Sequence, residues 1–333
     1  MSVFTRVLAC LILAFSGPAI AGEAAGKPLR ILTVGNSFAN DATAYLPAMA
    51  KASGRNLVLL RANLGGCSLE RHVHHLQAFE ANSTDPEGRP YRAGLVRSSG
   101  DTSPPALGAG GNDTAEPPRF ISLKEALESE RWDFVTIQQV STESFKSGSF
   151  EPYAGILIGY IHKYAPSAEI LVHQTWAYRE DCPLFQNGFT QQKMFEGLKS
   201  AYGMLAEKYH LRVIPVGTAI QQARKLPRWT FSWPDPKFDY KNPAPGTKPD
   251  QKGSLSVGWM VSKDKAHPVA SLDFKHCNVE GRYLAASVFY AFLFGDNAAD
   301  NTFLPGGLDP KDAEILRGIA DNVLGRRPAA AVR

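Results

Sequence analysis

Short apolar runs rich in β-branched residues alternate along this chain with longer stretches of helical periodicity. The apolar runs, which we expect to be buried strands, lie at residues 30–34, 57–60, 132–137, 169–173 and 212–216. The helical stretches cover residues 41–53, with Asp41 as the expected N-cap, and residues 69–79, 153–164, 194–209, 279–294 and 312–324. Such alternation is typical of a parallel sheet with helices on both faces. We therefore predict an α/β fold, a three-layer α/β/α sandwich around a sheet of five parallel strands.

Length and charge limit the domain organisation and the classes of partner. The chain has 333 residues, enough for one or two domains with sizeable cores. We interpret residues 28–325 as a single domain with two insertions, at about 82–118 and 228–269, where Pro, Gly and polar residues interrupt the periodic patterns. The formal net charge of +4 is small and comes without a run of Lys or Arg, so we expect no nucleic-acid partner.

The N-terminal segment has the features of a secretory signal peptide. Arg6 supplies the positive charge, residues 7–15 form an apolar run too short to span a bilayer, and Ala19-Ile20-Ala21 is a cleavage pattern. We expect residues 1–21 to be removed and the mature chain to be secreted or periplasmic. No later stretch predicts a membrane span.

Ser37 is the first candidate for chemistry. It follows the first predicted strand in the sequence Val34-Gly-Asn-Ser-Phe38, where a serine hydroxyl can point into the crevice at the carboxyl edge of the sheet. Its backbone N–H can also help to bind a developing oxyanion. The alternative interpretation is a serine that only caps the next helix.

A serine nucleophile needs a base, and the base needs a partner that fixes its tautomer. The segment Leu272-Asp-Phe-Lys-His276 offers both, since Asp273 precedes His276 by three residues. It lies after the fifth predicted strand and just before the last large helix. The alternative is a surface aspartate and a helix-capping histidine, because Asp-x-x-His alone is a weak motif.

Candidate oxyanion donors follow the second and third predicted strands. Gly65-Gly66 ends the second strand, and a glycine there lets the backbone approach a substrate and offer an N–H group. Gln138-Gln139 ends the third strand, and a side-chain amide can donate to an oxyanion. A plain turn and a solvated loop amide are the alternatives. All these groups follow strands of one sheet, so we expect them to converge at one edge.

The combination resembles the SGNH hydrolases. That family places its nucleophile in a Gly-Asp-Ser-like block, which is Gly35-Asn-Ser-Phe38 in this chain. Its second block supplies a glycine N–H, matched by Gly66, and its last block is Asp-x-x-His, matched by Asp273 and His276. The third block usually supplies an asparagine from a Gly-x-Asn-Asp motif. This chain has Ile-Gln-Gln there, like the sialate acetylesterase-like branches that use a glutamine.

More closely, four segments resemble the bacterial SGNH subgroup known as DUF4886: residues 32–38, 64–69, 174–178 and 272–276. The resemblance implies the SGNH hydrolase fold with a flavodoxin-like sheet and ester hydrolysis without a cofactor. It implies Ser37, Asp273 and His276 as the catalytic triad. It also implies an oxyanion hole formed by Ser37, Gly66 and Gln138, with Gln139 open as the alternative to Gln138.

Other residues carry smaller expectations. His72 and His75 share one face of a predicted helix, but no carboxylate is spaced to complete a metal site, so we expect no metal. Residues 173–176 either line the pocket or are buried structural residues. The tryptophans at 229, 233 and 259 either stack on sugars or pack the second insertion onto the body. Three cysteines follow the signal segment, an odd number whose pairing stays open: Cys67, Cys182 and Cys277.

These observations predict a secreted serine esterase that hydrolyses acyl esters, chiefly acetyl esters of carbohydrates. The partner is then a small-molecule or glycan ester, and the oligomeric state stays open. A lipid or lysophospholipid esterase and a polysaccharide acyltransferase are the alternatives with the same triad. The alternative of another class is a non-catalytic carbohydrate-binding protein.

Overall fold

The computed structural model describes residues 26–99 and 119–326, which build on one six-stranded sheet. The strand order is β4-β2-β1-β6-β7-β8, and every neighbouring pair is parallel except β4 with β2. The strands are β1 Leu29–Gly35, β2 Leu57–Asn63, β4 Leu95–Arg97, β6 Phe134–Ile137, β7 Glu169–His173 and β8 Arg212–Ile214. The five parallel strands have the flavodoxin-like order 2-1-3-4-5. The predicted α/β fold class is confirmed.

The parallel strands are buried because their side chains are apolar on both faces. Ile31 and Val34 in β1 are at most 1% exposed. β1 lies between β2 and β6, with Gly35 opposite Asn63 and Val34 opposite Ile137. Since parallel strands end at the same edge, the segments that leave β1, β2 and β6 begin side by side.

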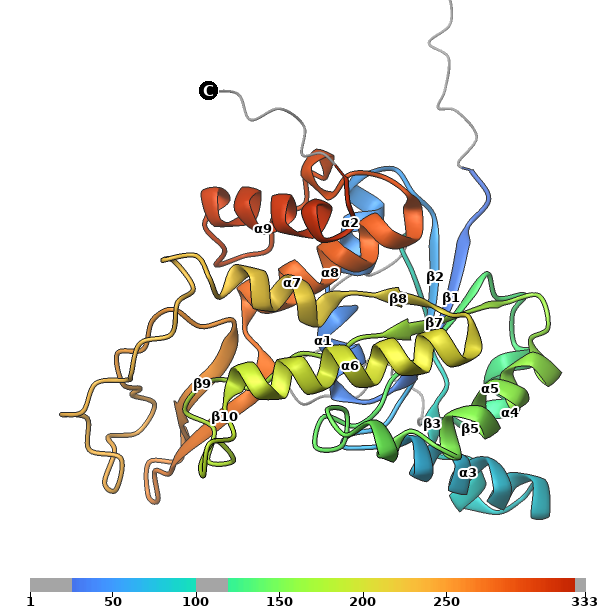
Figure 1. The fold of residues 1–333 in the computed structure, drawn as a ribbon, viewed down its shortest axis with the longest axis horizontal. Helices are drawn as coiled ribbons and strands as arrows, with labels where there is room; N and C mark the ends of the chain where they lie inside the picture. Colours follow the sequence, from blue (N-terminus) through green and yellow to red (C-terminus); the bar gives the residue numbers. More distant parts are fainter. Residues whose placement is uncertain (1–25, 100–118, 327–333) are drawn as a thin grey trace, which may run out of the picture.

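Helices cover both faces of the sheet (Figure 1). On one face α1 Ser37–Ala42 and α2 Leu46–Ala52 pack against α8 Val279–Phe294. On the other face α3 Leu69–Ala81, α4 Leu123–Glu128 and α5 Tyr153–Tyr164 pack together. α6 Gln191–Tyr209 lies against β8, while α7 Val216–Ala223 and α9 Pro310–Val323 pack onto α8. α8 is therefore enclosed on most sides, which agrees with its apolar sequence.

The helix predicted at residues 41–53 is two helices, and Asp41 is not an N-cap. α1 has Asn36 as its N-cap, whose Oδ1 atom accepts the N–H of Phe38 at 3.1 Å. α2 carries Pro47 in its first turn, a position where the missing N–H of proline is tolerated. Asp41 instead lies buried within α1 and makes tertiary contacts.

The first insertion, 82–118, has more regular structure than the expected loop. It holds β4 and β3 Tyr91–Arg92, and β3 pairs with β5 Phe120–Ile121. β4 extends the sheet as an antiparallel edge beside β2. Residues 100–118 and the predicted signal peptide lie outside the described residues. Three short 3-10 helices complete the elements of the described residues: Pro86–Gly88, Ser147–Ser149 and Ala298–Asp300.

The second insertion, 228–269, leads into a hairpin outside the central sheet. β9 Ser256–Val261 pairs antiparallel with β10 Ala270–Cys277, and β10 runs directly into α8 (Figure 1). The Asp-x-x-His segment thus lies on a strand that the sequence pattern did not predict. Among the residues described, no helix has the length and apolar character needed to cross a membrane.

Candidate active site

Three of the predicted site residues lie in hydrogen-bond contact. The Nε2 atom of His276 is 2.8 Å from the Oγ atom of Ser37, and its Nδ1 atom is 2.8 Å from the Oδ2 atom of Asp273. Ser37 is the first residue of α1, and the other two lie on β10. The fold thus joins a hydroxyl, an imidazole and a carboxylate, although Ser37 and His276 are 239 positions apart in sequence.

Asp273 and His276 reach the same side of β10 because the strand is irregular between them. On a regular strand, side chains three positions apart point to opposite faces. The pairing with β9 shifts register between Asp273 and Cys277. The Oδ1 atom of Asp273 accepts the backbone N–H groups of Lys275 at 3.2 Å and His276 at 3.0 Å. These bonds curl the backbone so that the carboxylate meets the imidazole ring.

The electrostatics of the pair suit a base. Burial alone would raise the pKa of Asp273, but the hydrogen bonds from the ring and backbone of His276 outweigh it, so this pKa lies below its ordinary value. The ionised carboxylate can only accept hydrogen bonds, so it holds the proton of His276 on Nδ1. The lone pair of Nε2 then faces the hydroxyl of Ser37. The side chain of His276 remains 26% exposed, which leaves the pair accessible to a substrate.

A second Asp-x-x-His sequence provides a comparison within the chain. Asp264 and His267 have the same spacing, but the Nδ1 and Oδ2 atoms lie 3.9 Å apart and the side chain of His267 is 87% exposed. No serine hydroxyl of the described residues contacts His267. The spacing alone therefore does not make a site; the contact with Ser37 distinguishes His276.

Asn36 holds the nucleophile segment in place, a role that the sequence reasoning missed. Its side chain is buried, and its Nδ2 group donates to the carbonyl oxygen of Cys67 at 3.1 Å. Its Oδ1 atom accepts the N–H of Phe38 and also the Nε2 group of Gln138 at 2.8 Å. An N-cap residue type directly before a helix-starting Ser37 was the available signal. The alternative in which Ser37 itself caps the helix is wrong, because Asn36 is the cap.

The two backbone N–H groups predicted to bind the oxyanion, those of Ser37 and Gly66, have no hydrogen-bond acceptor among the described residues. Gly66 lies in an exposed turn with φ of +62°, a conformation that favours glycine. Within the described residues, neither the N–H of Gly66 nor that of Ser37 donates to an acceptor. Both groups remain available to bind a ligand oxygen.

Gln138 is buried and oriented by its neighbours. The Nδ1 atom of His173 lies 2.6 Å from the Oε1 atom of Gln138. Burial lowers the pKa of His173 to about 3, so the ring is neutral and donates its Nδ1 hydrogen to this oxygen. The amide NH2 group of Gln138 is thereby turned toward Asn36. One of its two hydrogens is donated to the Oδ1 atom of Asn36. The second hydrogen is the one that could serve an oxyanion.

Gln139 has a different environment, and its side chain is fully engaged. Its Oε1 atom accepts the N–H groups of Leu69 at 3.0 Å and Val140 at 2.8 Å. Its Nε2 group donates to the carbonyl oxygen of Ser149 at 2.8 Å. Gln139 thus ties the start of α3 to the loop after β6, and it is not a solvated loop amide.

A buried ion pair connects the serine and histidine segments. Asp41 lies one helical turn after Ser37, and its Oδ2 atom accepts the backbone N–H of Cys277 at 2.8 Å. Its Oδ1 atom pairs with the guanidinium of Arg282 at 2.6 Å, and the two side chains are 3% and 11% exposed. Because Cys277 follows His276 directly, this carboxylate fixes α1 against the end of β10.

Residues 173–176 are buried, so the structural interpretation of this segment holds. The ring of Trp176 stacks on Phe38 with centroids 4.2 Å apart. Its Nε1 group donates to the carbonyl oxygen of Lys275 at 2.8 Å. Trp176 therefore supports both the residue after Ser37 and the residue before His276.

The histidines that were considered for metal binding are also structural. The Nε2 atom of His72 lies 3.0 Å from the carbonyl oxygen of Gly35, and its Nδ1 atom lies 2.8 Å from the hydroxyl of Tyr91. The Nδ1 atom of His75 lies 2.8 Å from the carbonyl oxygen of Glu87. The described parts of the chain contain no group of His, Cys, Asp and Glu suited to a metal ion. The cysteines whose pairing was open are all free and buried: Cys67, Cys182 and Cys277.

Comparison with known families identifies the middle of the chain. Residues 110–227 match the family model described as "Domain of unknown function (DUF4886)". This stretch of the chain is similar to the DUF4886 family. The matched part includes β6, β7 and β8 with Gln138, whereas Ser37 and His276 lie outside it. No curated protein matches the chain significantly.

One solved structure extends this likeness to the whole fold, and two others show a more distant likeness. A DUF4886 family protein from Bacteroides uniformis has a TM-score of 0.65 at 24% identity, over 90% of this chain and 95% of that one. An acetylxylan esterase from Geobacillus stearothermophilus has a TM-score of 0.43 at 10% identity, over 81% and 95%. A lipase/acylhydrolase from Enterococcus faecalis has a TM-score of 0.37 at 12% identity, over 80% and 96%. The predicted resemblance to DUF4886 is confirmed by the family match and by the fold of the Bacteroides uniformis protein.

The role of Asn36 can be tested by Asn36→Asp. A carboxylate cannot donate to the carbonyl oxygen of Cys67, so we expect a loss of about 1–3 kcal/mol in the free energy of unfolding. We also expect turnover of p-nitrophenyl acetate to fall at least tenfold. Urea denaturation and steady-state kinetics measure the two effects.

Asn301 is a matched control, since it also accepts an N–H two residues on and donates to a distant carbonyl oxygen, that of Met49. Asn301→Asp should lose similar stability and keep its turnover rate. Equal turnover in both variants would show that Asn36 only stabilises the fold.

The buried ion pair can be tested by Asp41→Asn. The variant leaves the charge of Arg282 without a counter-charge, so we expect the free energy of unfolding to fall by about 3–5 kcal/mol. The double variant Asp41→Asn/Arg282→Gln should recover part of this loss. Chemical denaturation measures both. A single variant within 1 kcal/mol of the wild type would contradict the need for the pair.

Proposed function

We propose that the chain is a serine esterase with Ser37 as nucleophile, His276 as general base and Asp273 as the residue that orients the base. The observation that carries this proposal is the continuous hydrogen-bonded series from Asp273 through His276 to Ser37, with both contacts at 2.8 Å. A base must lie within hydrogen-bond reach of the proton that it removes. The series meets that requirement.

The reaction follows from these positions. The Nε2 atom of His276 takes the proton of Ser37 as Oγ attacks the ester carbonyl. The negative charge on the carbonyl oxygen is stabilised by the N–H groups of Ser37 and Gly66 and by the amide of Gln138. His276 then protonates the departing alcohol, and a water molecule, deprotonated by the same nitrogen, releases the acid from Ser37. No cofactor takes part in these steps.

We further propose that the substrate is an acetylated carbohydrate. The proposed secretion of the chain supports this class, as do the aromatic side chains of the second insertion beside the hairpin. The first assay is the release of acetate from a panel of acetylated oligosaccharides, including acetylated xylo-oligosaccharides, alongside p-nitrophenyl acetate. Adding an acceptor glycan to the same assay distinguishes hydrolysis from acyl transfer.

The nucleophile and base can be tested by Ser37→Ala and His276→Ala. Each variant should lose at least about 1,000-fold in kcat on p-nitrophenyl acetate, and the double variant should lose little more, because triad residues act as a unit. His267→Ala removes the histidine of the other Asp-x-x-His sequence and should keep the wild-type rate. A Ser37→Ala variant with wild-type rate would overturn the assignment, and additive losses would show that the two residues do not cooperate.

The oxyanion donor can be tested by Gln138→Ala beside Gln139→Ala. A side-chain amide aimed at the developing charge is worth about 3 kcal/mol, so Gln138→Ala should lower kcat at least about 100-fold with little change in KM. Gln139→Ala should instead lower the melting temperature, because it removes the four hydrogen bonds of this side chain. A large loss of kcat at Gln139 alone would reverse the two roles.

A further inference from the structure

Gln138 and His173 lie side by side at the carboxyl edge of the sheet. The residues before them, Ile137 of β6 and Val172 of β7, are paired in register. Neighbouring residues in register project from the same face of a sheet. The imidazole of His173 therefore meets the amide of Gln138, and their Nδ1 and Oε1 atoms are 2.6 Å apart. Gly35 lies on the other side, where a Cβ atom would come within 3.0 Å of the Gln138 side chain, so glycine leaves the space for this amide.

The direction of the hydrogen bonds around this amide is fixed at Asn36. A carbonyl oxygen can only accept and a backbone N–H can only donate. The carbonyl oxygen of Cys67 is 3.1 Å from the Nδ2 atom of Asn36, and the backbone nitrogen of Phe38 is 3.1 Å from its Oδ1 atom. The asparagine amide therefore has one possible orientation. Its Oδ1 atom faces Gln138 and needs a donor there, which is the Nε2 group of Gln138 at 2.8 Å.

The orientation of Asn36 in turn determines those of Gln138 and His173. With its NH2 group toward Asn36, Gln138 turns its oxygen to the imidazole, which must carry its hydrogen on Nδ1. A reversed Gln138 amide would place two acceptors opposite each other at Asn36 and two donors at His173. Burial lowers the pKa of His173 to about 3, so the ring is neutral and has one hydrogen to donate. The Nε2 atom has no partner among the described residues, so a hydrogen placed there would have no acceptor.

The side chain of His173 makes no other polar contact within the part of the chain that the structure describes. It is 0% exposed, and its ring packs edge-on against Phe289 of α8 with centroids 5.0 Å apart. A buried polar ring costs free energy that only its hydrogen bonds offset. An apolar side chain could fill the same space, so the bond to Gln138 is the one contribution at this position that requires a histidine.

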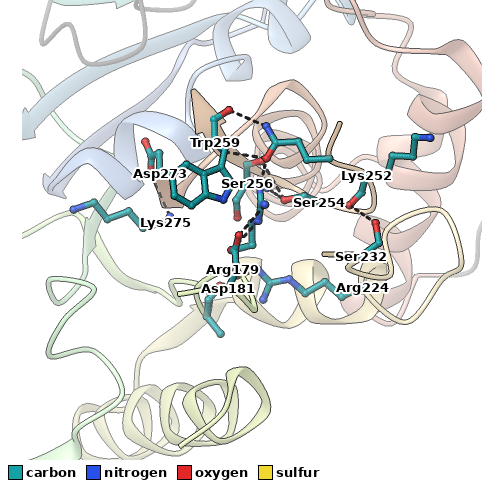
Figure 2. Close-up of polar contacts among 12 residues, drawn as sticks. Arg179, Asp181, Arg224, Ser232, Lys252, Ser254, Ser256, Trp259, Asp273 and Lys275 are labelled. Atoms are coloured by element: carbon teal, nitrogen blue, oxygen red, sulfur yellow. Dashed lines mark hydrogen bonds and ion pairs between the residues drawn. The ribbon is translucent and has the colours of Figure 1, made fainter. Parts of the chain in front are cut away.

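The proposed triad is fixed from a different side. Arg179 is 1% exposed and pairs with Asp181 at 2.9 Å (Figure 2). Its backbone N–H donates to the carbonyl oxygen of Phe274, which lies between the aspartate and the histidine of the triad. Among the described residues, none of these three forms a hydrogen bond with His173. His173 thus contacts Gln138 directly and reaches β10 only through packing on Trp176, with ring centroids 6.3 Å apart.

We propose that His173 is a positioning residue of the oxyanion hole, which holds the Gln138 amide with its NH2 group beside the nucleophile segment. The bond from His173 is the only one to the Gln138 oxygen among the described residues. Without it, that oxygen is buried and unsatisfied, and the amide can turn away from the orientation in which it donates to the oxyanion. An amide that presents its oxygen instead would repel the developing charge. This inference rests on the proposed esterase function and on the donor role of Gln138.

Two variants of His173 separate its hydrogen bond from its packing. The side-chain nitrogen of asparagine lies near the position of the histidine Nδ1 atom, whereas leucine fills a similar volume without a donor. His173→Leu should lower kcat on p-nitrophenyl acetate at least about tenfold, a part of the loss expected when the amide itself is removed, with KM changed less than about twofold. His173→Asn should keep kcat within about threefold of the wild type, although both variants lower the melting temperature.

A double variant tests whether His173 acts through Gln138. In the Gln138→Ala background, His173→Leu should change kcat less than about twofold, because the amide that it positions is absent. His75→Leu is the matched control. His75 is also a buried histidine, with its Nδ1 atom 2.8 Å from the carbonyl oxygen of Glu87 and its Nε2 atom without a partner among the described residues. This control should lose stability and keep the wild-type kcat.

The outcomes are distinguishable. A His173→Leu variant with wild-type kcat, equal losses in the leucine and asparagine variants, or additive losses in the double variant would each overturn the role of His173. If His173→Leu does not fold, His173→Gln replaces it, because its longer amide reaches the position of Nε2 and not that of Nδ1. Failure of the proposed function shows elsewhere. It appears as a Gln138→Ala variant with wild-type kcat, which overturns both proposals, or as hydrolysis of p-nitrophenyl acetate that does not depend on Ser37.

Discussion

The hydrogen bonds of the Asn36 side chain are the interaction on which the geometry of the site depends. A parallel sheet brings the ends of β1, β2 and β6 to one edge, but it does not fix the segments that leave them. Asn36 does so by donating to Cys67 after β2 and accepting from Gln138 after β6. The sequence differs from the usual SGNH blocks at these positions, with Asn for Asp in the first block and Gln for Asn in the third. These two departures contact each other, so each provides the partner that the other needs.

The second half of the site comes from the far end of the chain and is held just as firmly. The body binds three backbone groups of β10: the carbonyl oxygen of Phe274 by Arg179, that of Lys275 by Trp176 and the N–H of Cys277 by Asp41. These contacts surround His276 in sequence. The imidazole of His276 is therefore held in position next to Ser37. Such preorganisation is what a nucleophile and its base require.

Much of the fold could be predicted from periodicity, and the failures have a common physical cause. The predicted segments at 153–164, 169–173 and 279–294 have the observed bounds, because the apolar pattern of each is uninterrupted. The separation of α1 from α2 was missed, since Asp41 resembles an N-cap when only its neighbours are considered. β4 and β9 were missed too. β4 is only three residues long. β9 is a strand because it pairs with β10, and this pairing leaves no signal in the local sequence.

In the candidate site too, residues in local sequence motifs could be predicted, whereas residues that act through tertiary contacts could not. Ser37, Asp273 and His276 could be named because family blocks are short and local, and the two 2.8 Å contacts between them are what such blocks imply. The residues that hold them in place could not be named. A buried polar group must find a partner to offset the loss of water, and that partner lies wherever the fold brings it. The interpretation of Gln139 as a solvated amide failed for this reason. Its bonds to Leu69 and Ser149 reach residues 70 and 10 positions away, and no spacing in the chain could indicate them.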